Sequence, residues 1–116
     1  MIPKELFKGS LKSIVLKLLA ENDRMYGYEI TQKVDMLSGG KIKLTYGALY
    51  PVLHKLEKDG ALETEAEVVN NRNRIYYKLT EKGTITAKER IKELEEFVQT
   101  IGILLNPQLG FEPCVC

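Results

Sequence analysis

The feature that most constrains the fold of this chain is an amphipathic helical segment followed directly by a basic β-hairpin, within residues 45–83. Thr45 is a suitable N-cap for the helix, and Asp59-Gly60 is a stop signal in which the glycine can take a left-handed conformation. The buried stripe is expected to be Leu49, Val52, Leu53 and Leu56. Pro51 lies inside the segment, so the helix either bends there or starts late.

Two short runs rich in β-branched and aromatic residues follow, at residues 61–69 and 74–79, and they predict the two strands of a hairpin. Between them lies the basic loop Asn70 to Arg74. Asparagine tolerates a positive φ, so a tight turn is feasible there. A helix followed by a basic hairpin allows a small domain to present one element to a DNA groove and a second to the neighbouring phosphates.

Two further helices are expected upstream. The first has Ser10 as a candidate N-cap, and its apolar stripe is Leu11, Ile14, Val15, Leu18 and Leu19. The second runs from about residues 26–28 to Leu37, with Ile30, Val34 and Leu37 on its inner face. After it, residues 41–44 alternate between lysine and an apolar residue, which indicates a short strand or an extended turn.

The last helix is expected to begin near Thr80 or Thr84 and to end at Asn106-Pro107. Its apolar residues repeat at spacings of three and four, which is a heptad seam. The seam consists of Thr84, Ala87, Ile91, Leu94, Val98, Ile101 and Leu105, and Phe97 and Leu104 widen it. Such a helix is roughly 35–40 Å long at 1.5 Å per residue. It would protrude from a small domain, so a second chain is expected to cover the seam in a two-fold dimer.

These elements predict an α+β, mostly α fold: a winged helix-turn-helix with a long C-terminal dimerisation helix. The expected division is a DNA-binding domain at residues 1–79, the dimerisation helix at 80–106 and a disordered tail at 107–116. Cys114 and Cys116 fall in that tail, and one intervening residue is poor geometry for a disulfide. Two cysteines are also too few to complete a metal site, so no metal and no cofactor are expected.

Length and composition fit one globular domain, with 116 residues of which 44% are hydrophobic. The chain has no apolar run long enough to span a membrane and no signal-peptide pattern, so the expected location is the cytoplasm. The net charge is only +1, but residues 1–79 carry 13 Lys and Arg against 10 Asp and Glu, and residues 80–116 carry 4 against 6. This distribution favours an arrangement in which residues 1–79 face DNA and residues 80–116 lie away from it.

The candidate DNA-contacting residues are polar or basic, apart from one glycine, and come from the helices, the loop before the third helix, and the hairpin. They are Tyr28, Lys41, Lys43, Thr45, Tyr46, Gly47, Tyr50, His54, Lys55, Lys58, Arg72, Asn73 and Arg74. Alternate hairpin residues project to one side, so Arg72 and Arg74 can reach one groove, where guanidinium groups favour phosphates and a narrow minor groove. The alternatives are a solvated hairpin tip, an exposed surface role for His54, and a packing role for Tyr50 between helix and wing.

Three segments together resemble the PadR family of transcriptional regulators. Residues 26–30 (YGYEI) resemble the family's second-helix motif, residues 47–60 (GALYPVLHKLEKDG) are similar to its recognition-helix signature, and residues 72–83 (RNRIYYKLTEKG) look like its wing and the following junction. The resemblance covers about residues 10–105. It departs from the family pattern at Ile75, where a basic residue is frequent, and in the asparagines of the turn.

The resemblance implies a homodimeric repressor of a pseudo-palindromic operator, released by a small hydrophobic or phenolic effector. It also implies the short subtype, in which the last helix and the N-terminal segment build the dimer. The expected dimerisation residues are Leu11, Ala87, Ile91, Leu94, Phe97, Val98, Ile101 and Leu105. The chain has no tryptophan, which often lines the pocket between subunits in this subtype, so Leu94 and Phe97 are the candidates to line an effector cavity.

Other classes of function have less support. The chain has one histidine, no glycine-rich phosphate loop and no cluster with metal-ligand spacing, so an enzyme is not expected. A winged helix that binds protein would not need Arg72 and Arg74 and would instead expose apolar residues on the hairpin. A ligand sensor that has lost DNA binding would depend on the cavity at the dimer seam. The predicted partners are therefore double-stranded DNA, a second copy of the chain and a small hydrophobic effector.

Overall fold

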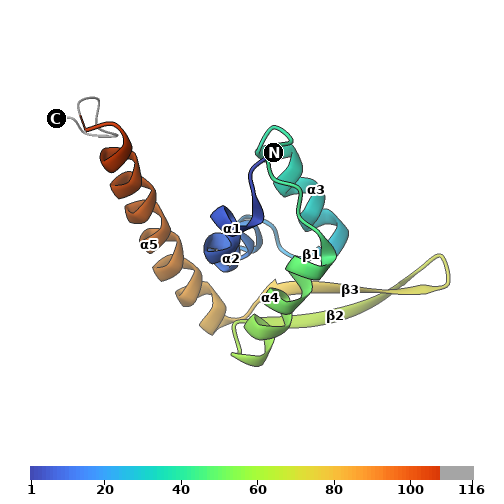
Figure 1. Ribbon diagram of the computed structural model, residues 1–116. Coiled ribbons are helices and arrows are strands. Elements are labelled where there is room, and N and C mark those ends of the chain that lie inside the picture. The colour runs from blue at the N-terminus through green and yellow to red at the C-terminus, as the bar shows by residue number, and fades with distance from the viewer. Residues whose placement is uncertain (108–116) are drawn as a thin grey trace.

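Three helices bury their leucine and isoleucine stripes against one another to form the core of the molecule. In the computed structural model, which describes residues 1–107, they are α2 (Leu11–Glu21), α3 (Gly27–Leu37) and α4 (Tyr46–Lys58) (Figure 1). The largest fully buried side chains are Val15, Leu16, Ile30, Leu49, Leu53 and Leu56. Each fully buried aliphatic side chain of this size contributes about 1.5–3 kcal/mol relative to an exposed one.

The N-terminus contains two short elements that the sequence did not predict, α1 (Lys4–Phe7) and the 3-10 turn η1 (Lys8–Ser10). Phe7 is buried in the core, which fixes this segment to the body. Helix α2 begins at Leu11 as predicted, but the side chain of Ser10 makes no capping hydrogen bond. Ser10 has helical backbone angles because the preceding turn runs straight into α2, so it is not in the extended conformation that an N-cap uses.

Helix α3 matches the predicted second helix, and Ile30 and Val34 are buried as expected. Leu37 was wrongly predicted to face inward: 64% of it is exposed, because α3 ends there. Residues 41–44 form no strand. They form an extended connection whose Lys41 carbonyl accepts a hydrogen bond from the backbone N–H of Ile2 at 2.7 Å.

Helix α4 begins at Tyr46 and continues through Pro51 to Lys58, so a late start is excluded. The Thr45 hydroxyl accepts a hydrogen bond from the backbone N–H of Ala48 at 3.2 Å, which confirms Thr45 as the N-cap. At the other end Gly60 has φ of 83°, the left-handed conformation predicted for the stop signal.

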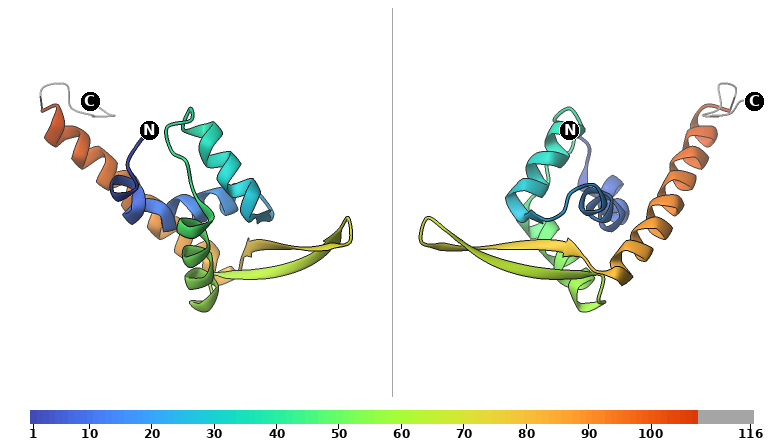
Figure 2. Two further views of the ribbon diagram at one scale, coloured as in Figure 1. Left: turned by 45° about the vertical axis from the view of Figure 1, so that its right-hand side comes forward. Right: turned by 180° about the vertical axis from the view of Figure 1, so that it is seen from behind.

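The sheet has three antiparallel strands in the order β1-β3-β2: β1 (Met25–Tyr26), β2 (Leu62–Val69) and β3 (Arg72–Leu79). Asn70 and Asn71, with φ of 52° and 63°, form a two-residue turn of the type that suits the right-handed twist of a hairpin. The predicted five-residue basic loop is therefore wrong, since Arg72 to Arg74 belong to β3. The hairpin, called the wing below, projects to the side opposite the last helix (Figures 1 and 2).

The last helix, α5 (Glu81–Leu105), has 25 residues and the predicted ends. Thr80 is its N-cap and accepts a hydrogen bond from the backbone N–H of Gly83 at 3.0 Å. The early turns of α5 pack on α2, whereas its C-terminal part stands clear of the other elements (Figure 2). The tail predicted to be disordered, residues 107–116 with Cys114 and Cys116, lies outside the described residues apart from Pro107.

Candidate nucleic-acid interface

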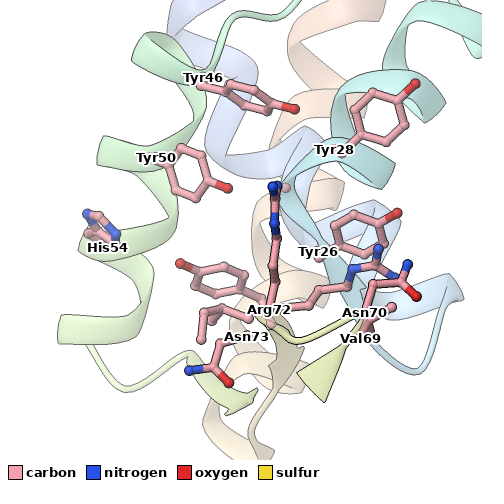
Figure 3. Close-up of a pocket in the computed structure, with 13 residues that line it drawn as sticks. Tyr26, Tyr28, Tyr46, Tyr50, His54, Val69, Asn70, Arg72 and Asn73 are labelled. Atoms are coloured by element: carbon pink, nitrogen blue, oxygen red, sulfur yellow. The ribbon is translucent and has the colours of Figure 1, made fainter. Parts of the chain in front are cut away.

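One open groove of about 1020 Å³ lies between the N-terminal end of α3, the outer face of α4 and the wing (Figure 3). It is lined mainly by aromatic and basic side chains. The lining residues are Tyr26, Gly27, Tyr28, Tyr46, Tyr50, His54, Val69, Asn70, Arg72, Asn73, Arg74, Ile75 and Tyr77. Five of the six tyrosines of the chain are in this set. The groove therefore collects hydrogen-bonding hydroxyls and positive charge on one side of the molecule.

The α4 wall of the groove is a row of rings spaced four residues apart: Tyr46, Tyr50 and His54. Residues at this spacing occupy one helix face, which lies beside the face whose leucines fill the core. The ring centroids of Tyr46 and Tyr50 are 5.6 Å apart, and those of Tyr50 and His54 are 5.9 Å apart. This face of α4 thus presents two phenol hydroxyls and an imidazole outward, which suits contacts with phosphates or base edges.

The opposite wall is the basic strand of the wing. Arg72 and Arg74 alternate with Asn73 along β3, so the two guanidinium groups share one face of the strand. In Figure 3 the side chain of Arg72 extends between the helix that carries Tyr50 and the helix that carries Tyr28. Within residues 1–107 neither arginine makes a salt bridge, so both charges remain available to a ligand.

Arg74 is held in place by aromatic rings. Its guanidinium carbon lies 4.1 Å from the centroid of the Tyr26 ring, and its Nη1 donates to the hydroxyl of Tyr76 at 3.5 Å. This hydrogen bond is the largest of the causes that raise the pKa of Arg74 above its ordinary value. The Tyr26 and Tyr76 rings meet edge to face at 5.4 Å. Arg74 is therefore more ordered than a cation at a free hairpin tip.

Tyr50 both packs against the start of α3 and lines the groove. Its packing role is therefore confirmed, and its contact with DNA stays a prediction. Tyr50 is half-buried, and its hydroxyl lies so close to Gly27 that a Cβ at that position would collide with it. Gly27 is the first residue of α3, so this contact fixes the spacing between the N-terminal end of α3 and α4. His54 is exposed, as its alternative role supposed, but it also lines the groove.

The structure brings together seven of the thirteen candidate DNA-contacting residues. Those that line the groove are Tyr28, Tyr46, Tyr50, His54, Arg72, Asn73 and Arg74. Those that do not are Lys41, Lys43, Thr45, Gly47, Lys55 and Lys58. The second set lies in the connection before α4 and on other parts of α4.

Two lysines of the second set already have acidic neighbours. Lys43 Nζ lies 2.8 Å from Asp35 Oδ2, and Lys55 Nζ lies 3.3 Å from Asp59 Oδ1. Both pairs are largely exposed, so solvent screens them and the lysines can exchange these partners at small cost. The hydroxyl of Thr45 is occupied by its capping hydrogen bond.

Sequence reasoning missed three residues around the groove: Arg24, Tyr26 and Gly27. Tyr26 supports Arg74, and Gly27 makes room for Tyr50. Both belong to the YGYEI segment, from which only Tyr28 was selected. Arg24 contacts the wing through Glu65 and Glu67. No local sequence signal identifies Arg24, because its partners are 41 and 43 residues away.

The residues expected at a dimer seam fall into two groups. Leu11 and Ala87 are 2% and 1% exposed, because α2 and α5 cover them within one chain. Their prediction as dimerisation residues is therefore corrected: they belong to the core. Ile91 and Leu94 are partly covered. The apolar residues further along α5 that remain exposed include Phe97, Val98, Ile101, Leu104 and Leu105.

Leu94 and Phe97 line an open hollow of about 420 Å³ between α5 and the N-terminal elements. The other lining residues are Glu5, Leu6, Gly9, Ser10, Ser13, Arg90 and Glu93. The two residues selected as candidates for an effector cavity thus lie beside one hollow with a mixed apolar and charged wall. The hollow is open in the single chain, so the residues of one chain alone would not enclose an effector there.

Comparison with known proteins identifies the family. Residues 15–89 match the sequence profile described as the transcriptional regulator PadR-like family. The chain belongs to this family. The matched region includes α3, α4 and the whole wing, so every residue that lines the groove lies within it.

Individual relatives agree with this assignment. A transcriptional regulator of Mycobacterium tuberculosis is 33% identical over 98 residues, which cover 84% of this chain and 88% of that protein. An uncharacterized protein of Lysinibacillus sphaericus is 32% identical over 107 residues, covering 91% and 97%. The solved structure of a transcriptional regulator from Clostridium thermocellum superposes with a TM-score of 0.76 at 27% identity and covers 87% and 95% of the two chains.

The PadR-like assignment makes this protein a DNA-binding transcriptional regulator with a winged-helix fold, and not an enzyme. Among residues 1–107, none of the helices combines the length and the apolar character that crossing a membrane requires. The family relationship confirms the predicted class of function.

Proposed function

We propose that this PadR-like protein is a sequence-specific regulator that binds double-stranded DNA through the groove between α3, α4 and the wing. The observation that carries the proposal is that Arg72 and Arg74 face Tyr46, Tyr50 and His54 across one open groove. A basic strand opposite a polar helix face gives two separate contacts to DNA, one for the phosphates and one for the base edges. The groove offers this pairing without any internal acid among its lining residues.

In the proposed complex, the outer face of α4 enters the major groove. Gly47 supports this placement, because a Cβ there would meet only the Thr45 hydroxyl at 3.9 Å, so the first turn of α4 can approach DNA closely. Tyr28, Tyr46 and His54 supply hydrogen-bonding groups, and Tyr50 sets the spacing between the two helices. Lys41, Lys43, Lys55 and Lys58 are proposed as contacts with flanking phosphates outside the groove.

The wing is proposed to lie beside the phosphates or in a narrow minor groove. Arginine suits both places, because its planar guanidinium binds phosphate in two-point geometry and favours strong negative potential. Asn73 lies between the two arginines on the opposite face of β3 and can donate from its amide. The turn residues Asn70 and Asn71 add no charge, so Arg72 and Arg74 provide the positive charge at the end of the wing.

We also propose that two chains dimerise through the exposed apolar stripe of α5. Residues 1–79 then form the DNA-binding part of each subunit and residues 80–106 the dimerisation helix. The two α4 helices read half-sites about one helical turn apart on a pseudo-palindromic operator. Such a complex blocks other proteins from the same DNA, which favours repression. Because bacterial DNA lies in the cytoplasm, the proposed activity is cytoplasmic.

Release by a small hydrophobic or phenolic effector is proposed for the hollow beside Leu94 and Phe97. What supports this is its position between α5 and the N-terminal elements, where a ligand would alter how α5 leaves the body. A change in that angle would alter the spacing of the two α4 helices. Since half-site spacing is fixed by the DNA, such a change weakens binding.

The experiment that tests the DNA interface is a gel shift against the DNA upstream of the protein's own transcription unit, over a series of salt concentrations. The double substitution Arg72→Ala and Arg74→Ala should weaken binding at all salt concentrations. It should reduce the slope of log K against log salt by about two for each subunit, because each phosphate contact contributes roughly −0.9 to that slope.

The matched control is the double substitution Lys17→Ala and Lys88→Ala, which removes the same charge from α2 and α5, away from the groove. The control should leave the slope nearly unchanged. Equal slopes for the wing variant and the control would contradict the proposed role of the wing.

A further inference from the structure

The strand that neighbours the arginines of the wing is acidic, which poses a problem for DNA binding. In the pairing of β2 with β3, Glu67 lies directly opposite Arg74, Glu65 opposite Tyr76 and Glu63 opposite Lys78. Directly opposed side chains in an antiparallel pair have Cβ atoms about 4.5–5.5 Å apart, and opposite charges there form ion pairs. By default, Arg74 would therefore bind Glu67 within its own wing.

The structure shows a different partner for Glu67. Arg24, which precedes β1, reaches across the sheet and makes salt bridges to both Glu65 and Glu67; its Nη1 lies 3.4 Å from Glu65 Oε1. Its guanidinium carbon lies 3.8 Å from the centroid of the Tyr76 ring. The hydrogen bond to Glu67 is the largest of the causes that raise the pKa of Arg24. Glu67 is thus already paired with an arginine on the same face of the sheet as Arg74.

Arg74, by contrast, makes no salt bridge within the part of the chain that the structure describes. Its guanidinium lies on the Tyr26 ring, at the groove, and Tyr26 also contacts Tyr76 edge to face. The four side chains form one stack in which each arginine covers the tyrosine of the neighbouring strand. Arg24 is not among the residues that line the groove, and its contacts are with Glu65, Glu67 and the Tyr76 ring.

We propose that Arg24 is a positioning residue for DNA binding: it holds Glu65 and Glu67 so that Arg74 stays on Tyr26 and faces the groove. This inference rests on the proposed function, in which Arg74 contacts DNA. The salt bridges of Arg24 are partly exposed, so they contribute little to folding stability. Their effect is on the charge that the wing presents.

The test measures DNA affinity by fluorescence anisotropy for the full chain and its variants. Arg24→Ala should weaken binding by about tenfold at low salt, roughly the effect of one lost phosphate contact, because Glu67 becomes free to pair with Arg74. Adding Glu67→Gln to this variant should restore binding to within about threefold of the natural chain, since Arg74 then has no acid opposite it. Arg24→Lys should give an intermediate loss, because an ammonium group cannot hold two carboxylates in fork geometry.

Glu63→Gln is the matched control for charge. It removes the same negative charge from the same strand and face, but it lies opposite Lys78 rather than Arg74. In the Arg24→Ala background it should leave the weakened binding in place. Restoration by Glu63→Gln as well as by Glu67→Gln would overturn the proposal, because net charge would then explain the rescue.

Two other results would also overturn the inference. Arg24→Ala with unchanged affinity would show that Glu67 does not compete for Arg74, and a loss that Glu67→Gln does not restore would show that Arg24 acts directly.

The Arg74→Ala single variant separates this inference from the proposed function. If Arg74→Ala binds DNA normally, the proposed function of the wing fails; if it binds weakly and Arg24→Ala does not, only the inference fails.

Discussion

Helices α4 and α5 are built alike but are covered differently. Each begins at a threonine N-cap and carries an apolar stripe at helical spacing. Leu49 and Leu53 of α4 are completely buried by the same chain, whereas Phe97 and Leu104 of α5 are 57% and 69% exposed. The apolar stripe of α4 is therefore buried within the subunit, whereas the C-terminal part of the apolar stripe of α5 is exposed.

The contrast between α4 and α5 marks the limit of what a periodic apolar pattern establishes. An apolar stripe predicts that one face of a helix will be buried, but it does not say whether the covering surface belongs to the same chain. On α5 the boundary falls between Ala87, which is 1% exposed, and Val98, which is 49% exposed. The first turns of α5 complete the core, and the exposed stripe beyond them is available to a partner.

The largest effect is expected from polar substitution of the exposed stripe. Replacing Phe97, Val98 and Ile101 with asparagine should weaken dimerisation by at least ~100-fold, because large buried anchors account for most of the energy of an interface. Sedimentation equilibrium measures the change as a shift to the mass of one chain. The matched control is Glu95→Gln with Glu96→Gln on the same helix, which should leave the dimer intact. A natural chain that already sediments as a monomer would remove the contrast between the two helices.

A second prediction applies one chemical change to both helices. Leu53→Ala should lower the free energy of unfolding by about 2–5 kcal/mol, because it leaves a cavity in the core. Leu104→Ala removes the same atoms from an exposed site, so any loss should come from the dimer and should depend on protein concentration. Urea unfolding at two protein concentrations distinguishes the two effects. A concentration-independent loss of similar size at both sites would contradict the comparison.

Much of the fold could be predicted because its signals are local. Thr45, Gly60 and Thr80 mark helix ends through contacts with residues only a few positions away. The two strands of the wing were also predicted, although Arg72 to Arg74 were placed in a loop. The reason is that Asn70 and Asn71 both take a positive φ, which closes the turn in two residues rather than five.

The features that could not be predicted depend on contacts between distant segments. Strand β1 has only two residues and exists because Met25 and Tyr26 pair with β3. The groove was predicted in part, as a helix face and a pair of arginines, but Tyr26 and Gly27 were missed because their roles arise from contacts with Arg74 and Tyr50. Ala87 was assigned to the dimer because a heptad pattern does not show where α2 covers α5. Leu11 was assigned to it because the family resemblance implied that the N-terminal segment helps to build the dimer, and the core instead buries it.

A third prediction concerns the junction between the two regions. Gly83, in the first turn of α5, lies so close to Ala61 that a Cβ would collide with the Ala61 carbonyl oxygen. Gly83→Ala should destabilise the chain by about 1–3 kcal/mol, since the backbone must shift to relieve the overlap and alanine's helix propensity offsets only part of the cost. Thermal unfolding measures the loss. The control is Thr84→Ala, one residue later and exposed, which should change stability much less.

The smallest effect should appear in the two N-caps, where it also tests how tightly each helix is fixed to the body. Thr45→Ala should cost about 1 kcal/mol, the usual value for a lost capping hydrogen bond. Thr80→Ala should cost more, because the Thr80 hydroxyl both accepts from the Gly83 N–H and donates to the Gly60 carbonyl at 2.6 Å. The second bond ties the start of α5 to the end of α4, so its loss loosens the junction as well as the helix.

Serine at either position keeps the hydroxyl and is the matched control, and urea unfolding compares all four variants. If Thr45→Ala proved the more costly change, α5 would be attached mainly by the packing of its early turns on α2 and not by its cap.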